Sequence, residues 1–332
     1  MRAYASDRRL PTVKAAVYDH TGPPDVLRYE DVPDPACPPG HVRIAVEAIS
    51  IEGGDTLNRA GGELATTPHI VGYQCAGTIA EVGDGVTDRQ VGQHVVATML
   101  WGSHAEQVAV PSVLTWPVPE GADIVEIACV PIAFGTAHDC LFEFGHLQPG
   151  ESVLVQAGAS GVGIAAIQLA KRAGATVLAT ASSTERLERL TKLGLDHGVD
   201  YTQPDWVDQV RSATGGRGVD LAVDSVGGPT LVGSIGCLTY RGRCITVGNA
   251  GRDPQPFDVS LLAMGNHSLT GVFLGAEMLN ERAHAMIGRL VDEVAGGELR
   301  VIVDRTFPLA EAAAAHAYIE SRQAVGRVVL LP

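Results

Sequence analysis

The chain has 332 residues, which is enough for two domains that each bury a hydrophobic core. Its hydrophobic content of 45% and charged content of 19% are those of a folded globular protein and exclude a disordered chain. The net charge of -14, with no run of Lys or Arg to offset it, repels phosphate backbones and argues against nucleic acid as a partner.

The cysteines and the apolar segments indicate where the protein works. Its six cysteines form no CxxC pair, which fits a reducing compartment. No apolar run approaches the length of a membrane span, and the segment MRAYASDRRLPTVK lacks the apolar centre of a signal peptide. We therefore expect a cytoplasmic protein that does not contact a membrane.

The first third of the chain has the pattern of β structure. Short β-prone segments cover residues 13–18, 42–49 and 76–83, and clusters of Pro and Gly such as residues 33–40 separate them. From about Glu151 the pattern changes to an alternation of strands and helices, which predicts a parallel sheet with helices on both faces. The expected strands are 153–156, 176–181, 220–224, 243–247 and 269–273, and the expected helices are 162–173, 184–193, 205–213 and 229–239. Two further helix-like runs, 281–295 and 310–321, and a strand-like end, 326–331, complete the chain.

A glycine-rich turn stands between the first of these strands and the first helix. The segment Gly158-Ala-Ser160-Gly161-Val162-Gly163 is one residue away from the dinucleotide fingerprint G-x-G-x-x-G, and it lies where that fingerprint must lie. Gly158 would allow the tight turn, and Gly163 would allow the helix to pack closely on the strand. Serine at the middle position is small enough to let a pyrophosphate approach the helix N-terminus. The sequence predicts a dinucleotide-binding turn, although a structural turn has the same appearance.

The end of the second strand indicates which dinucleotide binds. NAD enzymes place Asp or Glu there, about 20 residues beyond the turn, to hold the ribose 2′-hydroxyl. Here the strand ends in Ser182-Ser183-Thr184-Glu185-Arg186, with hydroxyls and an arginine and no acid at its tip. These groups suit a 2′-phosphate, so NADPH is the expected cofactor. The alternative for Ser183 or Thr184 is a helix cap.

Seven motifs together resemble those of the medium-chain dehydrogenase/reductase superfamily, and within it the zinc-free NADPH:quinone oxidoreductases related to zeta-crystallin. Besides the glycine turn, the segments that carry the resemblance are GYQCAGTIAEVG (72–83), VGQHV (91–95), AEQVAVP (105–111), GTA (135–137), DSVGG (224–228), and AHAYIESR (315–322) with GRVVL (326–330). The resemblance implies an α/β protein with a GroES-like, β-rich substrate domain and a doubly wound, parallel-sheet Rossmann domain. It implies a substrate domain formed by residues 1–133 and 278–332, with the NADPH-binding domain, 134–277, between them.

The resemblance also bears on zinc. Zinc-dependent relatives have a cysteine where this chain has Glu52, and Gly-His-Glu where it has Gly72-Tyr73-Gln74. The four-cysteine loop expected after Val96 is missing, so thiolate and imidazole ligands are lacking and we expect no metal. Glu52 with His69 or His104 would be an unusual site, and scattered histidines are more often packing or surface residues.

Without a metal, the acceptor must be one whose reduced anion is already delocalised, such as a quinone or a conjugated enone. By resemblance, Thr136 lies beside the nicotinamide, the backbone of Phe273 and Leu274 binds its carboxamide, and Val226, Gly248 and Asn249 line the cofactor cleft. Tyr73 and Trp101 are candidates for the substrate wall, and core packing is the alternative for Trp101.

Three further residues are expected to form a clamp around the 2′-phosphate. The resemblance places Arg186, Tyr201 and Arg322 there, and two guanidinium groups with a phenol would balance the phosphate charge. Arg186 as a solvated helix residue and Arg322 as a helix C-terminal cation are the alternatives.

The chain departs from the family pattern near the acceptor. Quinone reductases of this group have asparagine at the position of Glu52 and tyrosine at that of Leu57, whereas Asp55 and Arg59 keep the family spacing. Glu52 is expected to bind a ribose hydroxyl or, if burial raises its pKa, to deliver a proton; a solvent-facing loop carboxylate is the alternative.

Three functions follow from these observations. An NADPH-dependent quinone reductase is the first, with Glu52, Asp55, Tyr73 and Trp101 as the residues nearest the acceptor. An enoyl reductase acting on an unsaturated ketone or thioester is the second. An RNA-binding, crystallin-like protein is the third, and the acidic balance argues against it. The resemblance further implies a homodimer joined through an edge strand at residues 268–273.

Overall fold

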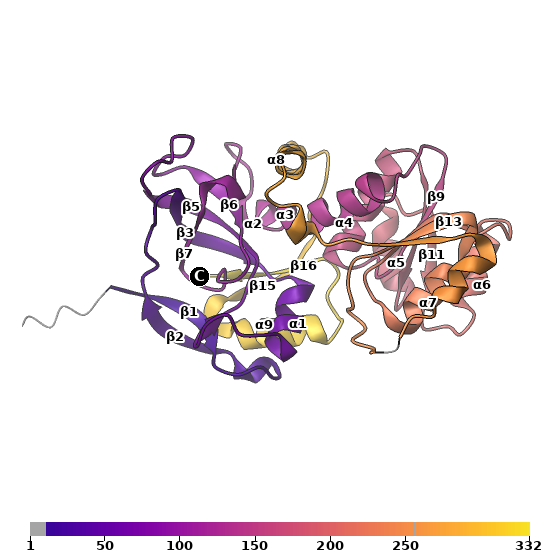
Figure 1. Ribbon diagram of the computed structural model, residues 1–332, viewed down its shortest axis with the longest axis horizontal. Coiled ribbons are helices and arrows are strands. Elements are labelled where there is room, and N and C mark those ends of the chain that lie inside the picture. The colour runs from indigo at the N-terminus through magenta and orange to yellow at the C-terminus, as the bar shows by residue number, and fades with distance from the viewer. Residues whose placement is uncertain (1–10, 255) are drawn as a thin grey trace, which may run out of the picture.

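The computed structural model describes residues 11–254 and 256–332, so most of the segment inspected for a signal peptide lies outside the described residues. Two lobes lie along the long axis of the molecule, one rich in β structure and one with helices around a sheet (Figure 1). Across the described residues, no helix has the length and apolar character that a membrane crossing needs.

The second lobe is built on a sheet of six parallel strands with the order β11-β10-β9-β12-β13-β14. This 3-2-1-4-5-6 order is that of a dinucleotide-binding fold, which confirms the predicted fold class. The strands are β9 (Ser152–Val155), β10 (Thr176–Ala181), β11 (His197–Asp200), β12 (Val219–Asp224), β13 (Leu238–Thr246) and β14 (Ser268–Gly271). The helices between them are α4 (Gly161–Arg172), α5 (Thr184–Thr191), α6 (Trp206–Ala213) and α7 (Gly228–Gly236).

Alternate residues of the central strand show why this sheet is covered on both faces. Val153 and Val155 of β9 belong to the core shared with α4, whereas Leu154 belongs to the core on the opposite face with α6 and α7. Both faces of a strand must then be apolar, which explains the continuous Ser-Val-Leu-Val run in the sequence.

The first lobe contains a larger sheet with the order β15-β16-β3-β5-β6-β8, with β7 paired to β3, and a small sheet with the order β2-β1-β4. Its first strands are β1 (Thr12–Tyr18), β2 (Arg28–Pro33), β3 (His41–Ser50), β4 (His69–Ile70) and β5 (Gln74–Val82). The others are β6 (His94–Thr98), β7 (Gln107–Pro111), β8 (Thr115–Pro117), β15 (Val303–Pro308) and β16 (Arg327–Leu331). The remaining helices are α1 (Gly53–Gly61), α2 (Ile124–Ile127), α3 (Val130–His138), α8 (Glu281–Ala295) and α9 (Ala312–Glu320).

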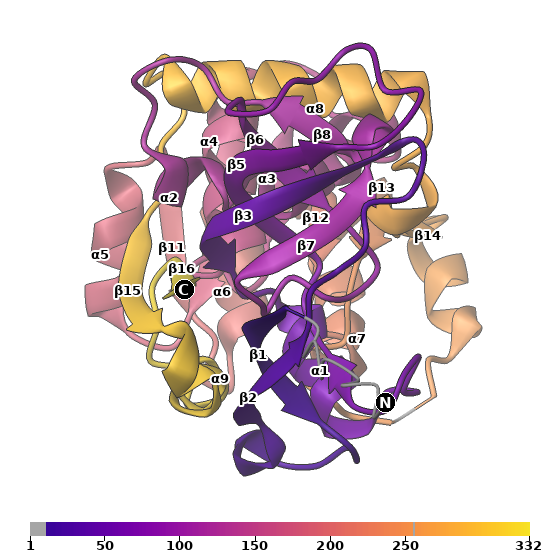
Figure 2. The ribbon, with the colours of Figure 1, turned by 90° about the vertical axis from the view of Figure 1, so that its left-hand side faces the viewer.

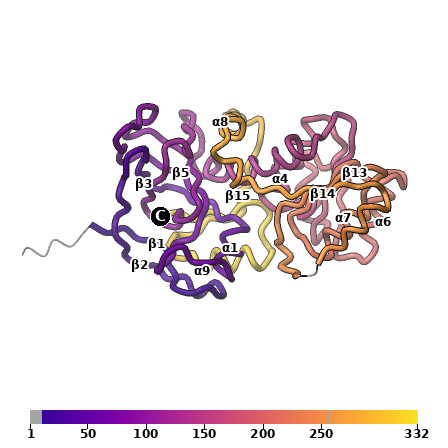
Figure 3. Tube along the Cα trace, in the orientation of Figure 1, coloured from indigo at the N-terminus to yellow at the C-terminus, as the bar shows by residue number. Residues whose placement is uncertain are grey.

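The C-terminal segment returns to the first lobe. β16 pairs antiparallel with β3, with Val329 opposite Ser50 and Leu330 opposite Ile49. Figure 3 traces this return, with the yellow end of the chain running back among the indigo strands. The chain therefore brings segments that are far apart in the sequence together as neighbouring strands of one sheet.

Helix α8 lies across the other end of the β-rich lobe, beside β8 (Figure 2). The indole of Trp116 donates to the carbonyl of His284 at 2.9 Å and stacks on its ring at 4.8 Å. At the start of α8, Arg282 makes two bonds to the buried carboxylate of Asp139, at 2.7 and 3.1 Å. These contacts fix α8 against α3 and the following helical turn, close to the junction of the lobes.

In the second lobe, the predicted elements lie within a few residues of their expected positions, with two differences. Strand β11 was not predicted, because it has four residues of which only Val199 is buried. Strand β13 begins at Leu238, inside the helix expected over 229–239, because α7 ends at Gly236. Short elements with few buried side chains have little hydrophobic periodicity to reveal them.

Candidate active site

The glycine turn follows β9 and opens α4, as its position in the sequence predicts. The N–H of Gly158 donates to the carbonyl of Thr180 at 2.8 Å, and a Cβ on Gly163 would overlap the backbone of Ala157 and Gly158. Ser160 is the N-cap of α4, and its Oγ accepts the N–H of Gly163 at 3.1 Å. The serine at the middle position of the fingerprint therefore stabilises the helix N-terminus that would face a pyrophosphate. Gly161 and Val162 form the first turn of that helix.

A network of buried polar side chains lies beside the glycine turn and stabilises it. Thr180 donates to Gln156 at 2.6 Å, Gln156 donates to Ser234 at 3.0 Å, and Ser234 donates to Asp224 at 2.7 Å. The other oxygen of Asp224 accepts the backbone N–H groups of Val226 and Gly227, each at 2.8 Å. Because every bond in this chain is internal, the turn after β12 that carries Val226 is held rigidly beside the turn after β9.

The hydroxyl-rich end of β10 lies at the same edge of the sheet. Ser183 caps α5, and its Oγ accepts the N–H of Arg186 at 3.4 Å, so the capping role is present. Ser182, Ser183 and Arg186 are all partly exposed. Tyr201 follows the neighbouring strand β11, and its N–H donates to the carbonyl of Ala181 at 3.1 Å. The structure thus brings these four predicted residues to one edge.

Two other features of this edge affect its charge. Asp200 pairs with Ala181 in the sheet, and its carboxylate accepts two bonds from Thr202, at 2.9 and 2.7 Å, so this acid is occupied locally. A bond to Asp304 raises the pKa of Tyr318 in α9, and Arg186 acts in the opposite direction, which places Arg186 near α9. Arg322, two residues beyond α9, is exposed and has a φ of 58°.

The turns expected around a nicotinamide also lie together. Thr136 in α3 is 7% exposed, and a Cβ on its neighbour Gly135 would lie 3.0 Å from the side chain of Leu274. Phe273 is 73% exposed, so it stands free of the core. The pair Gly248 and Asn249 follows β13, and the side chain of Asn249 lies over Gly227, whose Cβ would be 2.8 Å from its Oδ1.

Glu52 lies at the junction of β3 and α1, and it is almost fully buried at 4% exposure. Its Oε1 accepts bonds from Gln74 at 2.5 Å, from Ser50 at 3.4 Å, and from the guanidinium of Arg327. Gln74 is itself fixed, because its Oε1 accepts the N–H of Ile132 at 3.0 Å. Glu52 is therefore an internal ion-pair residue, and the alternative of a solvent-facing loop carboxylate is wrong.

Arg327 completes this cluster from the far end of the chain. Its guanidinium also donates to Ser50 Oγ, at 2.6 and 3.0 Å, and to the carbonyl of Ile51 at 2.8 Å. Its side chain lies against Gly161, where any Cβ would collide with the guanidinium. One arginine thus contacts both the start of α1 and the first turn of the helix that follows the glycine turn.

Burial and charge oppose each other in this pair. Burial raises the pKa of Glu52, and Arg327 works against that rise. Burial lowers the pKa of Arg327, but Glu52 and Cys129 together more than compensate, so the pKa of Arg327 ends above its usual value. The two groups stabilise each other's charged forms, yet the pKa of Glu52 stays above its usual value, so its expected role as a proton donor remains a prediction.

Asp55 and Tyr73 lie beside this pair. Asp55 is fully buried; its Oδ2 accepts the N–H of Glu52 at 2.8 Å, and its Oδ1 has no bond among the described residues. Burial raises the pKa of Asp55 well above its usual value. The hydroxyl of Tyr73 accepts a bond from Asn58 at 2.7 Å, and its ring packs over Gly54. The hydroxyl hydrogen of Tyr73 remains free to donate to a ligand.

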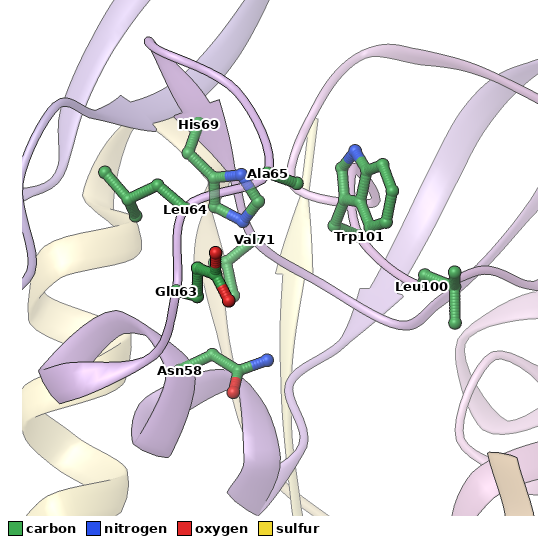
Figure 4. A pocket seen from close by; sticks show the side chains of 8 residues that line it. All are labelled: Asn58, Glu63, Leu64, Ala65, His69, Val71, Leu100 and Trp101. Atoms are coloured by element: carbon green, nitrogen blue, oxygen red, sulfur yellow. The ribbon is translucent and has the colours of Figure 1, made fainter.

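A cavity of about 370 Å³ opens next to Asn58. Figure 4 shows the eight residues that line it, which are Asn58, Glu63, Leu64, Ala65, His69, Val71, Leu100 and Trp101. Trp101 is 45% exposed, so it is not packed in a core, and its ring centroid lies 6.4 Å from that of His69. Because Asn58 also bonds to Tyr73, the cavity and the Glu52 cluster belong to one region.

The cluster does not fit a zinc ion. Within residues 11–254 and 256–332, no three His, Cys, Asp or Glu side chains gather closely enough to hold a metal. The positive guanidinium of Arg327 occupies Oε1 of Glu52, and a second cation there would be repelled. His104 bonds to His316 at 3.1 Å, and burial lowers the pKa of His104 to about 3. His69 lines the cavity, so the two histidines do not join Glu52.

Comparison with known proteins identifies the family. Residues 38–120 match the alcohol dehydrogenase GroES-like domain, and residues 161–292 match the zinc-binding dehydrogenase domain. The chain is 37% identical to a 2-haloacrylate reductase from Burkholderia over 96% of its own length and 99% of that protein. It therefore belongs to the medium-chain dehydrogenase/reductase family, as its motifs predict.

Solved structures show the same relationship. A mycobacterial protein complexed with NADPH is 34% identical, with a TM-score of 0.91 over 96% of this chain and 100% of that one. The Escherichia coli quinone oxidoreductase complexed with NADPH is 26% identical, with a TM-score of 0.91 over the same shares. The CurK enoyl reductase is 26% identical, with a TM-score of 0.86 over 97% of this chain and 99% of that one.

Sequence reasoning missed three residues of the site. Arg327 stands in the quoted segment GRVVL, but its partner Glu52 is 275 residues away and nothing in the sequence links them. Gln74 was noted only as the replacement of a zinc-ligand motif, and Asn58 was not considered. The sequence offers one indication of Arg327: it stands between a glycine and the apolar run of the last strand, where a charged residue is unusual.

The Glu52–Arg327 pair makes a testable contribution to stability. Arg327→Met leaves a buried carboxylate without its counter-ion, and we expect a loss of about 3–5 kcal/mol. Glu52→Gln combined with Arg327→Met should cost less than the sum of the single changes, as urea unfolding would measure. Lys171→Met, which breaks the exposed pair with Asp196, is the control and should cost less than about 1 kcal/mol. Additive losses at Glu52 and Arg327 would contradict the coupling.

Proposed function

We propose that this protein is an NADPH-dependent reductase that transfers hydride to a quinone or a similar conjugated carbonyl without a metal. The observation that carries the proposal is the position of Arg327, which touches Glu52 on the acceptor side and Gly161 on the cofactor side. This contact puts a cofactor turn directly beside a buried polar cluster that has no place for zinc. The resemblance to solved NADPH complexes supports the cofactor.

The cofactor would be held along the carboxyl edge of the parallel sheet. The turn from Gly158 to Gly163 receives the pyrophosphate, and Arg327, next to Gly161, adds positive charge there. The 2′-phosphate is held by Ser182, Ser183, Arg186, Tyr201 and Arg322. The nicotinamide half is held by Thr136, Val226, Gly248, Asn249, Phe273 and Leu274. NADPH bound there supplies the hydride.

The acceptor side orients the substrate and provides hydrogen bonds. Tyr73 accepts from Asn58, so its own hydrogen can be donated to an acceptor oxygen, and the raised pKa of the buried Asp55 favours its neutral form, which limits negative charge in the site. We assign to Glu52 a hydrogen bond to a ribose hydroxyl of the cofactor, with its carboxylate held in place by Ser50, Gln74 and Arg327. Trp101 forms the outer wall of the acceptor cavity.

An enoyl reductase is the second candidate. The similarity to CurK enoyl reductase and to 2-haloacrylate reductase favours it, because both names describe reduction of an unsaturated carbon–carbon bond. Turnover of NADPH with a panel of quinones and of unsaturated acyl thioesters separates the two candidates, since each predicts a preference for its own class.

The proposal also includes the boundaries of the two domains and the cellular location of the protein. We assign residues 1–133 and 278–332 to the substrate domain and residues 134–277 to the cofactor domain, which the pairing of β16 with β3 supports. The six cysteines are free thiols, and this supports a cytoplasmic location.

The choice of NADPH over NADH tests the cofactor side directly. We expect NADPH to bind much more tightly than NADH, and Arg186→Ala to weaken NADPH by about 1.5–3 kcal/mol while leaving NADH nearly unchanged. Titration of both cofactors measures this. Arg189→Ala, one turn along α5, removes an exposed arginine and is the control. Equal losses for both cofactors in Arg186→Ala would show that the residue supports the fold.

The exposed edge of β14 supports a homodimer. Among the described residues, Ser268–Gly271 pairs with β13 alone, and the neighbouring side chains of Val259, Met264 and Phe273 are at least 73% exposed. Joining two such edges would cover both the unpaired backbone and these apolar groups. Light scattering should give a mass near twice the 34.7 kDa of the chain, and a monomer at micromolar concentration would contradict the proposal.

A further inference from the structure

The charged side chains that line the acceptor cavity are of one sign, which is negative. Its described lining includes one carboxylate, Glu63, and neither lysine nor arginine. Figure 4 shows Asn58, Glu63 and His69 on one wall and Leu100 and Trp101 on the other. Glu63 is exposed and follows the end of α1, so its charge stands at the mouth of the cavity.

The two nearby basic residues do not supply a positive charge to the cavity. His69 is 5% exposed and burial lowers its pKa, so its ring is neutral at neutral pH. Arg59, on the same helix as Asn58, is fully buried and is bonded to the carbonyl of Gly22 at 2.6 Å and to Glu320. Among the described residues that line the cavity, a negatively charged ligand would therefore meet the carboxylate of Glu63 and no cation.

We propose that this cavity selects uncharged acceptors and discriminates against carboxylates, and that Glu63 sets this preference. The inference rests on the proposed function and narrows its substrate class to neutral quinones, enones and esters. It separates this chain from the 2-haloacrylate reductase that it resembles, because a 2-haloacrylate is an anion at neutral pH.

The physical reason is desolvation. A carboxylate that enters a cavity loses hydration, and only an ionic or hydrogen-bonding partner can compensate for that loss. A neutral carbonyl needs much less compensation, and the polar side chains of Asn58 and His69, which both line the cavity, offer it hydrogen bonds. The flat rings of Trp101 and His69 provide apolar contact for a conjugated system.

A matched pair of substrates isolates the charge. Methyl 2-chloroacrylate and 2-chloroacrylate share the same reacting double bond, and each takes hydride from NADPH at the β-carbon and a proton from solvent or the protein at the α-carbon. They differ in the charge of the carboxyl group. We expect kcat/KM at saturating NADPH to favour the ester by about tenfold or more.

Variants of the protein then test whether Glu63 sets this preference. Glu63→Gln should shift the ester-to-acid ratio about threefold toward the acid, the effect of one charge at the mouth of a solvated cavity. Glu120→Gln removes an exposed acid outside the cavity and should leave the ratio unchanged. A shift of the same size in both variants would show that overall protein charge acts, and would overturn the role of Glu63.

Two further results would separate a failure of the inference about charge from a failure of the proposed function. Equal or better turnover of the acid by an active enzyme would refute the inference and leave the proposed function intact. Absence of NADPH oxidation with quinones, enones and the ester alike would refute the proposed function, and the inference with it.

Discussion

The buried ion pair between Glu52 and Arg327 is the interaction on which the rest of the site depends. A carboxylate and a guanidinium that leave water lose several kcal/mol of hydration each, and they are stable inside a protein only if their other bonds are satisfied. Here Ser50, Gln74 and the carbonyl of Ile51 satisfy them. The pair therefore fixes the end of β3, the start of α1 and the start of β16 at one point, against the first turn of α4.

The proposed function requires the two lobes to cooperate without a metal, and this ion pair offers a way for them to do so. In a zinc enzyme the metal would organise the acceptor side and polarise the substrate. In the proposed mechanism, the guanidinium of Arg327 would take over the organising role, while Tyr73 and Asn58 would provide a neutral hydrogen bond. The consequence is weaker polarisation, which is sufficient for acceptors whose reduced form is already delocalised. The cavity beside Asn58, with its one carboxylate, fits the same restriction.

Local patterns in the sequence predicted the fold and most of the cofactor edge, because both depend on short segments. The glycine turn, the hydroxyls after β10 and the alternation of strands with helices are each contained in a few dozen residues. The acceptor side could not be predicted in the same way. Arg327 meets Glu52 only because β16 returns to pair with β3, and such pairing across 275 residues leaves no local pattern. The proton-donating role expected for Glu52 stays a prediction, because burial raises the pKa of this carboxyl while Arg327 opposes the rise.

The most direct test of the account is the zinc content and metal dependence of the active enzyme. Elemental analysis of the purified protein, followed by NADPH-dependent quinone reduction before and after prolonged treatment with a chelator, measures both. The account predicts no stoichiometric zinc and unchanged activity, because Arg327 already holds the carboxylate that a metal would need. About one zinc per chain, with activity lost on chelation and restored by zinc, would contradict it.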